Sequence, residues 1–313
     1  MEKQISYQDI FLKPQKCIVD SRKECDTSVT LGKYTFDMPV YPANMKSVVD
    51  IDTCKFLASK GWFYTMHRFG IDAIDFILEM NKNDIFTSIS IGINKDSYDT
   101  LEKIYQHPLF VDYITIDVAN AWSEKTHKMI DFIKNKFPET FLIVGNVATH
   151  EAVEELKKWG ASAIKAGISS GNACITKNKT GVYRGMITTL LDCCYDTNFP
   201  IIADGGIIEH GDIAKAISLG SRMVMAGSLF SAYDQSAGNL IEIEDRIYKE
   251  YYGSASKYNK NECKNIEGKK KLIQYKGDMN KLLIELKEDL QSSISYIGGK
   301  CLKDLNGAEC GII

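Results

Sequence analysis

The chain has 313 residues, of which 44% are hydrophobic and 25% are charged, with a formal net charge of −3 and an isoelectric point near 6.0. This length suits one large α/β domain or two ordinary ones. The weak negative charge provides no field that would favour nucleic acid or an anionic membrane. The start is polar, and no run approaches the roughly 20 apolar residues of a membrane span. We therefore expect a cytoplasmic protein without nucleic-acid or membrane partners.

The nine cysteines are scattered, with one adjacent pair at 193–194. None forms a Cys-x-x-Cys pair with histidine partners, so a structural zinc site is not expected. In a chain of this length without a secretory signal, they are predicted to be reduced thiols, most of them core residues.

Short apolar runs alternate with amphipathic segments along most of the chain. Eight runs are predicted strands: 40–45, 62–67, 87–92, 113–118, 141–146, 163–168, 200–205 and 223–228. Apolar residues at three- and four-residue spacing predict helices between them, for example 151–159 closed by Gly160 and 212–219 closed by Gly220.

Eight buried strands, each followed by a helix, predict a (β/α)8 TIM barrel formed by one domain over residues 1–313. A doubly wound open sheet is the alternative, but no Gly-x-Gly-x-x-Gly motif follows the first strand. Two insertions are expected at the C-terminal rim, at 172–198 and 231–278, and an amphipathic helix over 281–296 closes the chain.

Polar residues follow most of the predicted strands and would meet at one rim of the barrel. They are Asn44, His67, Asp117, Asn120, Asn146, Asp204, Gly227 and Ser228. Asn44 and Asn146 could also be helix caps, and His67 could be a packing histidine. Asp117 is harder to explain structurally, because an aspartate at the tip of an apolar strand costs desolvation unless something binds it.

The glycines of Asp204-Gly205-Gly206 and of Gly227-Ser228 predict a phosphate site, because their backbone N–H groups can approach a phosphate closely. Two tight turns are the alternative. Cys174 follows the run 163–168 in a loop that contains Gly171, with Thr176, Lys177, Lys179 and Arg184 downstream. The residues alone therefore predict a phosphorylated ligand beside a nucleophilic thiol.

Several motifs in chain order carry a resemblance to a known family. They are residues 42–45 (PANM), 117–120 (DVAN), 145–147 (GNV), 174–177 (CITK), 179–181 (KTG), 202–206 (IADGG), 252–256 (YGSAS), 266–269 (IEGK), 275–277 (YKG) and 290–296 (LQSSISY). Together they resemble the IMP dehydrogenase/GMP reductase family from about residue 7 to 302. The chain looks like the reductase branch, because no regulatory domain interrupts the barrel between Asp75 and Asp117 and because the element 267–269 is similar to the reductases' own.

The resemblance implies a (β/α)8 barrel, a homotetramer, and conversion of GMP and NADPH to IMP, ammonia and NADP⁺. It also implies that Cys174 attacks C2 of the purine, with Thr176 and Glu267 as the proton relay. The implied GMP-binding residues are Asp204, Gly205, Gly206, Gly227, Ser228, Gly253, Ser254, Ala255 and Gly268. The implied cofactor-binding residues are Arg68, Asp117, Val118 and Ala119, with Ser21, Arg22, Ser292, Ser293 and Ser295 contributed by a neighbouring subunit.

A potassium ion bound by the backbone carbonyls of Ser169, Gly171 and Cys174 is a further implication. Here the chain departs from the family, because Ser169 replaces the first glycine of a Gly-x-Gly pair. Residues 182–184 (VYR) also differ from the family pattern. Two alternatives stay open: a minimal NAD-dependent IMP dehydrogenase, and a catalytically weakened purine-nucleotide-binding homologue.

Overall fold

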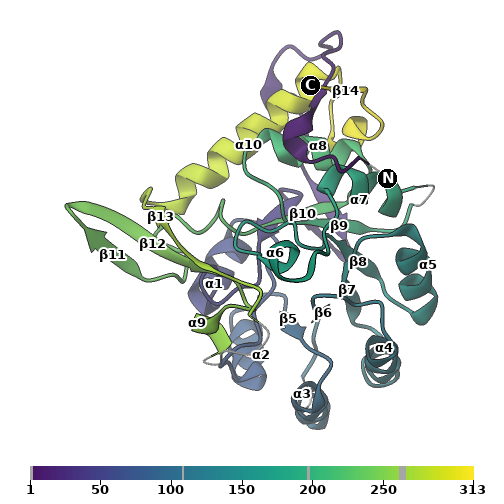
Figure 1. Ribbon diagram of the computed structural model, residues 1–313, viewed down its shortest axis with the longest axis vertical. Helices are drawn as coiled ribbons and strands as arrows, with labels where there is room; N and C mark the ends of the chain where they lie inside the picture. The colour runs from purple at the N-terminus through teal and green to yellow at the C-terminus, as the bar shows by residue number, and fades with distance from the viewer. Residues whose placement is uncertain (1–2, 108, 196–197, 261–265) are drawn as a thin grey trace.

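A seven-stranded parallel sheet forms the centre of the computed structural model, which describes residues 3–107, 109–195, 198–260 and 266–313 (Figure 1). Its strands are β4 (Val40–Pro42), β5 (Ser88–Ile91), β6 (Tyr113–Asp117), β7 (Phe141–Val147), β8 (Ala163–Ala166), β9 (Ile201–Asp204) and β10 (Met223–Ala226). They lie in the order β4-β10-β9-β8-β7-β6-β5, and every pair is parallel. The strands are buried on both faces, as expected when helices cover the sheet.

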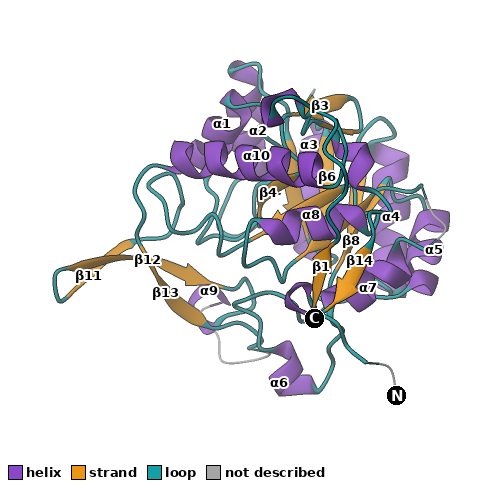
Figure 2. Cartoon of the chain, turned by 90° about the horizontal axis from the view of Figure 1, so that it is seen from above, coloured by secondary structure: helices purple, strands orange, loops and turns teal. Residues whose placement is uncertain are grey.

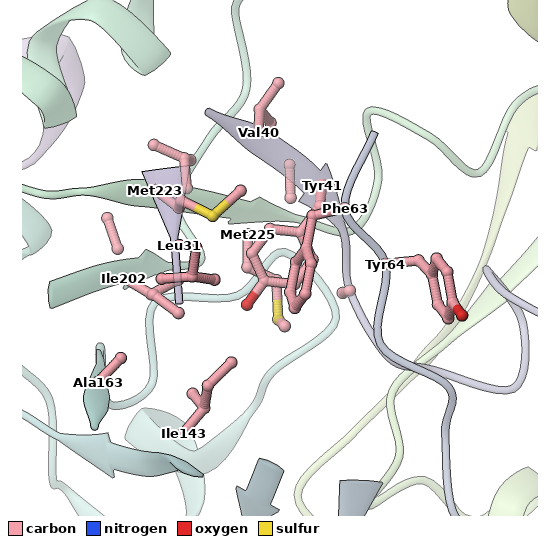
Figure 3. Packing of buried hydrophobic residues seen from close by; sticks show 14 of the residues in the cluster. Leu31, Val40, Tyr41, Phe63, Tyr64, Ile143, Ala163, Ile202, Met223 and Met225 are labelled. Carbon is pink, nitrogen blue, oxygen red and sulfur yellow. The ribbon is translucent and has the colours of Figure 1, made fainter. Parts of the chain in front are cut away.

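The prediction of a strand over 62–67 is wrong, because this segment forms a single β-bridge instead of a strand ladder. Met66 pairs with Ile89, and its N–H donates to the Ser88 carbonyl at 2.9 Å. Aromatic rings occupy the space toward β4, with the Phe63 and Tyr41 centroids 4.8 Å apart (Figure 3). This irregular segment therefore takes the eighth position of the barrel wall.

Helices alternate with the strands and lie outside the sheet (Figure 1). They are α1 (Ile51–Ser59), α2 (Ala73–Lys82), α3 (Lys95–Gln106), α4 (Glu124–Lys136), α5 (His150–Trp159), α7 (Met186–Cys193) and α8 (Gly211–Ser218). α5 begins at the N-cap Thr149 and ends at Gly160, whose φ of +110° suits glycine. The predicted (β/α)8 barrel class is confirmed.

The predicted insertion at 172–198 is wrong in its second half, because α7 is the barrel's own helix between β8 and β9. Its apolar residues Met186, Ile187 and Leu190 are buried, which the sequence pattern of this short segment did not reveal. Only the first half, with the short helix α6 (Thr176–Thr180), is an added rim loop.

The second insertion forms an antiparallel sheet of β11 (Leu240–Ile243), β12 (Arg246–Tyr252) and β13 (Lys270–Gln274), with α9 (Lys257–Lys260) before β13. Figure 2 shows this sheet projecting from one side of the barrel. The predicted closing helix is confirmed as α10 (Met279–Tyr296), which packs on α8.

The N- and C-terminal segments cover the rest of the barrel. β1 (Ile10–Leu12) pairs with β14 (Cys310–Ile312), and β2 (Val29–Leu31) pairs with β3 (Tyr34–Phe36). The described residues also contain three 3₁₀ helices, η1 (Tyr7–Asp9), η2 (Arg22–Glu24) and η3 (Leu302–Leu305). Among the described residues, no helix has the length and apolar character needed to cross a membrane.

Candidate active site

Cys174, Thr176 and Glu267 form a continuous hydrogen-bonded chain. The Cys174 thiol lies 3.2 Å from Oγ1 of Thr176, and that hydroxyl donates to Oε2 of Glu267 at 2.5 Å. All three side chains are partly buried. A thiol linked through a hydroxyl to a carboxylate can lose its proton to that carboxylate, and the same path can return it.

Backbone pairing brings Glu267 to the cysteine loop across 91 residues of sequence. The Ile175 N–H donates to the Glu267 carbonyl at 2.8 Å, and the Lys269 N–H donates to the Ala173 carbonyl at 2.9 Å. These bonds flank an antiparallel bridge between Cys174 and Gly268. The geometry of this hydrogen-bonded chain is therefore set by main-chain bonds between the two rim insertions.

Residues 253–256 pack directly against this pair of segments. A Cβ at Gly268 would lie 2.9 Å from the Ser256 nitrogen, and one at Gly253 would lie 3.3 Å from the Gly268 Cα. Only glycines permit such a close approach of backbones. The structure thus brings Gly253, Ser254, Ala255 and Gly268 together beside Cys174.

The glycines after β9 lie under the start of the cysteine loop. Ser170 donates through Oγ to the Asp204 carbonyl at 3.0 Å, and a Cβ at Gly205 would lie 2.8 Å from that Oγ. Gly205 and Gly206 have φ of +96° and +79°, which suits glycine and not a side-chain-bearing residue.

Tyr251 is a site residue that sequence reasoning missed. A Cβ on Gly227, after β10, would lie 2.4 Å from the Tyr251 hydroxyl, so the phenol sits at the expected phosphate site. Tyr251 is 3% exposed, and burial raises its pKa, which keeps the hydroxyl a neutral donor. Its place directly before the motif 252–256 was the available signal.

A cavity of about 330 Å³ opens beside the Cys174 loop. It is lined by Cys174, Ser170, Gly206, Lys269 and Lys271, among others. This volume is within the usual range of small-molecule sites. The two lysines supply positive charge, which suits a phosphorylated ligand.

Lys165 is the second residue that sequence reasoning missed. It lies in β8, is 1% exposed, and its Nζ is 2.7 Å from Oδ1 of Asp117 and 3.0 Å from Oδ2 of Asp204. Burial lowers its pKa, but the two carboxylates outweigh burial and raise it overall. A lysine inside a strand predicted to be buried was the available signal, because a buried charge needs partners.

The predicted cofactor residues form two groups that share no hydrogen bond within the described part of the chain. At the C-terminal end of β6, the Asp117 carboxylate accepts a hydrogen bond from the Asn44 side-chain amide at 3.1 Å. The Arg68 guanidinium lies 3.5 Å from the Asp117 carbonyl oxygen. Burial by itself raises the pKa of Asp117, but the Lys165 ammonium lowers it by more. The net pKa is therefore below the usual value of an aspartate, and the carboxyl stays ionised. Val118 and Ala119 follow directly after Asp117.

The remaining predicted cofactor residues gather around η2 and the end of α10. Arg22 donates to Ser292 at 3.1 Å, and Ser295 lies 3.2 Å from the Cys17 thiol. Ser21 caps η2, and Ser293 donates to the Asp289 carbonyl. Within the described residues, no hydrogen bond joins this group to the Cys174 loop.

The predicted potassium ligands are hard oxygen donors, which fit a monovalent cation. The Gly171 carbonyl accepts from the Cys174 N–H at 3.0 Å, and a carbonyl oxygen has a second lone pair for a cation. Ser169 has a φ of +64°, the left-handed conformation that a glycine would adopt more readily. Its hydroxyl donates to the Val182 carbonyl at 2.7 Å, which ties the two departures from the family pattern together.

Residues 4–310 match the IMP dehydrogenase / GMP reductase domain family. The chain belongs to this family. It is 56% identical over 306 residues to a GMP reductase of Chromobacterium violaceum, covering 98% of this chain and 97% of that protein. It is 49% identical to a GMP reductase of Oceanobacillus iheyensis, covering 100% and 97%. A GMP reductase of Variovorax paradoxus is 48% identical, covering 96% and 93%.

Proposed function

We propose that this chain is a GMP reductase that converts GMP and NADPH to IMP, ammonia and NADP⁺. The hydrogen-bonded chain Cys174–Thr176–Glu267 beside the glycine-lined cavity carries the proposal. Full-length relatives named GMP reductase, between 48% and 56% identical, support it.

The relay accounts for both proton movements of the first half-reaction. The Cys174 proton passes through Thr176 to Glu267, and the resulting thiolate adds to C2 of the guanine. Glu267 then returns a proton through Thr176 to the amino group, the C2–N bond breaks, and ammonia leaves. When bound, NADPH would supply a hydride for C2, and the C2–S bond would then break to release Cys174 as a thiolate that takes up one proton from solvent. Sulfur both adds and leaves readily, which divides one difficult substitution into two easier steps.

The remaining site residues fix the ligands. In this proposal Asp204 binds the ribose, Gly205, Gly206, Gly227 and Ser228 hold the phosphate, and residues 253–255 with Gly268 surround the base and phosphate. Arg68 and residues 117–119 lie along the nicotinamide cofactor. A second cavity of about 270 Å³ contains Asn120 and shares Tyr183 with the first, which supports an adjoining cofactor site.

The group around Arg22 and Ser292 would then bind the adenosine end of a cofactor held by a neighbouring copy. Within the described residues no hydrogen bond joins this group to the Cys174 loop, so we propose that a neighbouring copy brings the two together in a homo-oligomer, a tetramer of single-domain barrels. Dependence on potassium and a cytoplasmic location stay predictions.

Absorbance at 340 nm tests the activity. Loss of NADPH that depends on GMP supports the proposal, whereas NADH formation with IMP and NAD⁺ would assign an IMP dehydrogenase. An IMP dehydrogenase would need an Arg-Tyr pair on a mobile flap to activate water, and this chain has only the reversed pair Tyr183-Arg184. Arg184 is also held in place, because it is paired with Asp192 and donates to the Ala148 carbonyl at 2.6 Å. Binding of purine nucleotide without either reaction would assign a weakened homologue.

A further inference from the structure

Lys165 lies in a row with Gly145 and Asp117 across three neighbouring strands. Asp117 of β6 is in register with Gly145 of β7, and Gly145 is in register with Lys165 of β8. A Cβ at position 145 would lie 2.4 Å from the Lys165 Cβ. The absence of a side chain at Gly145 therefore leaves the space through which Lys165 and Asp117 meet.

Lys165 is buried, whereas the two carboxylates that it contacts, Asp117 and Asp204, are partly accessible. Lys165 is 1% exposed, while the side chains of Asp117 and Asp204 are 21% and 19% exposed. Asn146 donates to Oδ2 of Asp204 at 2.8 Å, the same oxygen that Lys165 contacts. In the described part of the chain, side-chain hydrogen bonds to Asp204 end on Oδ2, so Oδ1 is available to a ligand.

We propose that Lys165 is a positioning residue that couples the nucleotide-side carboxylate of Asp204 to the cofactor-side carboxylate of Asp117. The inference rests on the proposed function, which assigns one ligand to each carboxylate. A shared ammonium group holds both carboxylates at a fixed separation before either ligand arrives. A change of charge at one carboxylate then alters how strongly Lys165 pairs with the other, and so alters ligand binding there.

The other groups around Lys165 do not replace its charge. Tyr41 of β4 lies nearby, and burial raises its pKa, so its phenol stays neutral. Met225 of β10 places its sulfur 3.9 Å from Nζ. Arg68 faces Asp117 from the solvent side, where its guanidinium is exposed. Lys165 is thus the cation that contacts both carboxylates.

Asp117→Asn provides the main test, with GMP affinity measured by calorimetry on the full-length protein without cofactor. The proposed function assigns Asp117 to the cofactor and not to GMP, so a purely local role of Asp117 predicts an unchanged Kd for GMP. Coupling through Lys165 predicts a Kd raised at least about fivefold, because Lys165 then pairs with Asp204 alone. An unchanged Kd overturns the inference.

Lys165→Met and Lys165→Arg provide the second test. Without the cation that both carboxylates contact, their mutual repulsion is no longer compensated, so the Kd of the Met variant for GMP should become pH-dependent. Lys165→Arg should restore a flat profile. Lys249 is a matched control, because it is 4% exposed and bonds the Ser236 carbonyl at 2.7 Å outside this site. Lys249→Met should lower stability without changing the Kd.

The two proposals fail in different ways. If the wild-type protein neither binds GMP nor oxidises NADPH with it, the proposed function is wrong. If the wild type is active but Lys165→Met gives a flat pH profile of the Kd, the coupling role is wrong. Should Lys165→Met fail to fold, the Asp117→Asn measurement decides.

Discussion

Lys165 and the two carboxylates that it contacts lie on strands, whereas Cys174 and Glu267 lie on loops. Lys165, Asp117 and Asp204 are held by the ladders of β6, β8 and β9 and are paired without a ligand. Cys174 and Glu267 meet through a few main-chain bonds between two insertions. Groups on strands are positioned by the same ladders that hold the barrel together, so substitutions of these groups should change both ligand binding and the free energy of unfolding. Loop-borne groups should change with little effect on stability, because they lie outside the seven-stranded sheet of the barrel.

Cys174→Ala is the largest expected effect and tests the loop side of this contrast. Turnover should fall at least about 10⁵-fold, because no other group can form the covalent bond to C2. Calorimetry should still detect GMP binding, and thermal unfolding should change little. Cys310→Ala, an exposed cysteine, is the control. Residual activity of Cys174→Ala near the wild-type level would exclude the mechanism.

Glu267→Gln should lower kcat by about 10²- to 10⁴-fold, because the amide cannot accept the thiol proton that Thr176 transmits. Stopped-flow measurement of NADPH oxidation should place the loss in the chemical step, with the Kd for GMP retained. Glu242→Gln, on the exposed β11 strand, is the matched control. Equal losses in both variants would remove the relay role.

His67→Gln tests the wall segment at 62–67 through stability. Burial lowers the pKa of His67 to about 4 from about 6.5. The unfolded chain therefore binds the proton more readily, so this contribution to stability is present above pH 6.5 and is lost as pH falls toward 4. A shift of this size corresponds to about 3 kcal/mol. Urea unfolding at pH 7 and 5 should show a smaller acid loss for His67→Gln than for wild type. The exposed His107→Gln should retain the wild-type loss.

Tyr251→Phe tests a residue that joins the two regions. Tyr251 lies on β12 of the projecting sheet, but its hydroxyl lies against Gly227 at the end of β10. Loss of its hydroxyl should weaken GMP binding about tenfold, the value of one hydrogen bond to a charged group. Tyr233→Phe, another buried tyrosine, should bind GMP as wild type does. An unchanged Kd for Tyr251→Phe would remove the tyrosine from the phosphate site.

Ser169→Gly has the smallest expected effect. The residue is left-handed, so glycine relieves strain of about 1 kcal/mol, offset by the lost bond from Ser169 to the Val182 carbonyl. The free energy of unfolding should change by less than about 1 kcal/mol. If the conformation of the Cys174 loop limits turnover, kcat should change measurably. Glu244→Gly, left-handed in the distant β11–β12 turn, controls for strain alone.

The sequence by itself determined the barrel class, the order of seven strands, the closing helix and the position of Cys174 after β8. Hydrophobic periodicity and glycine caps are local signals, and they sufficed there. The strand predicted at 62–67 was wrong, because aromatic packing against Tyr41 takes the place of the strand ladder that the apolar composition favoured. α7 was missed because its buried face is set by contacts with β8 and β9.

Only the tertiary structure decided the contacts of Lys165, the Tyr251 hydroxyl beside Gly227, and the alignment of Thr176 with Glu267. Each depends on the register of strands or loops far apart in the chain, and no local pattern encodes that register. The resemblance supplied Cys174, Thr176 and Glu267 as candidates. The three-dimensional arrangement brought them within hydrogen-bonding distance, because backbone pairing joins residues 173–175 to 267–269.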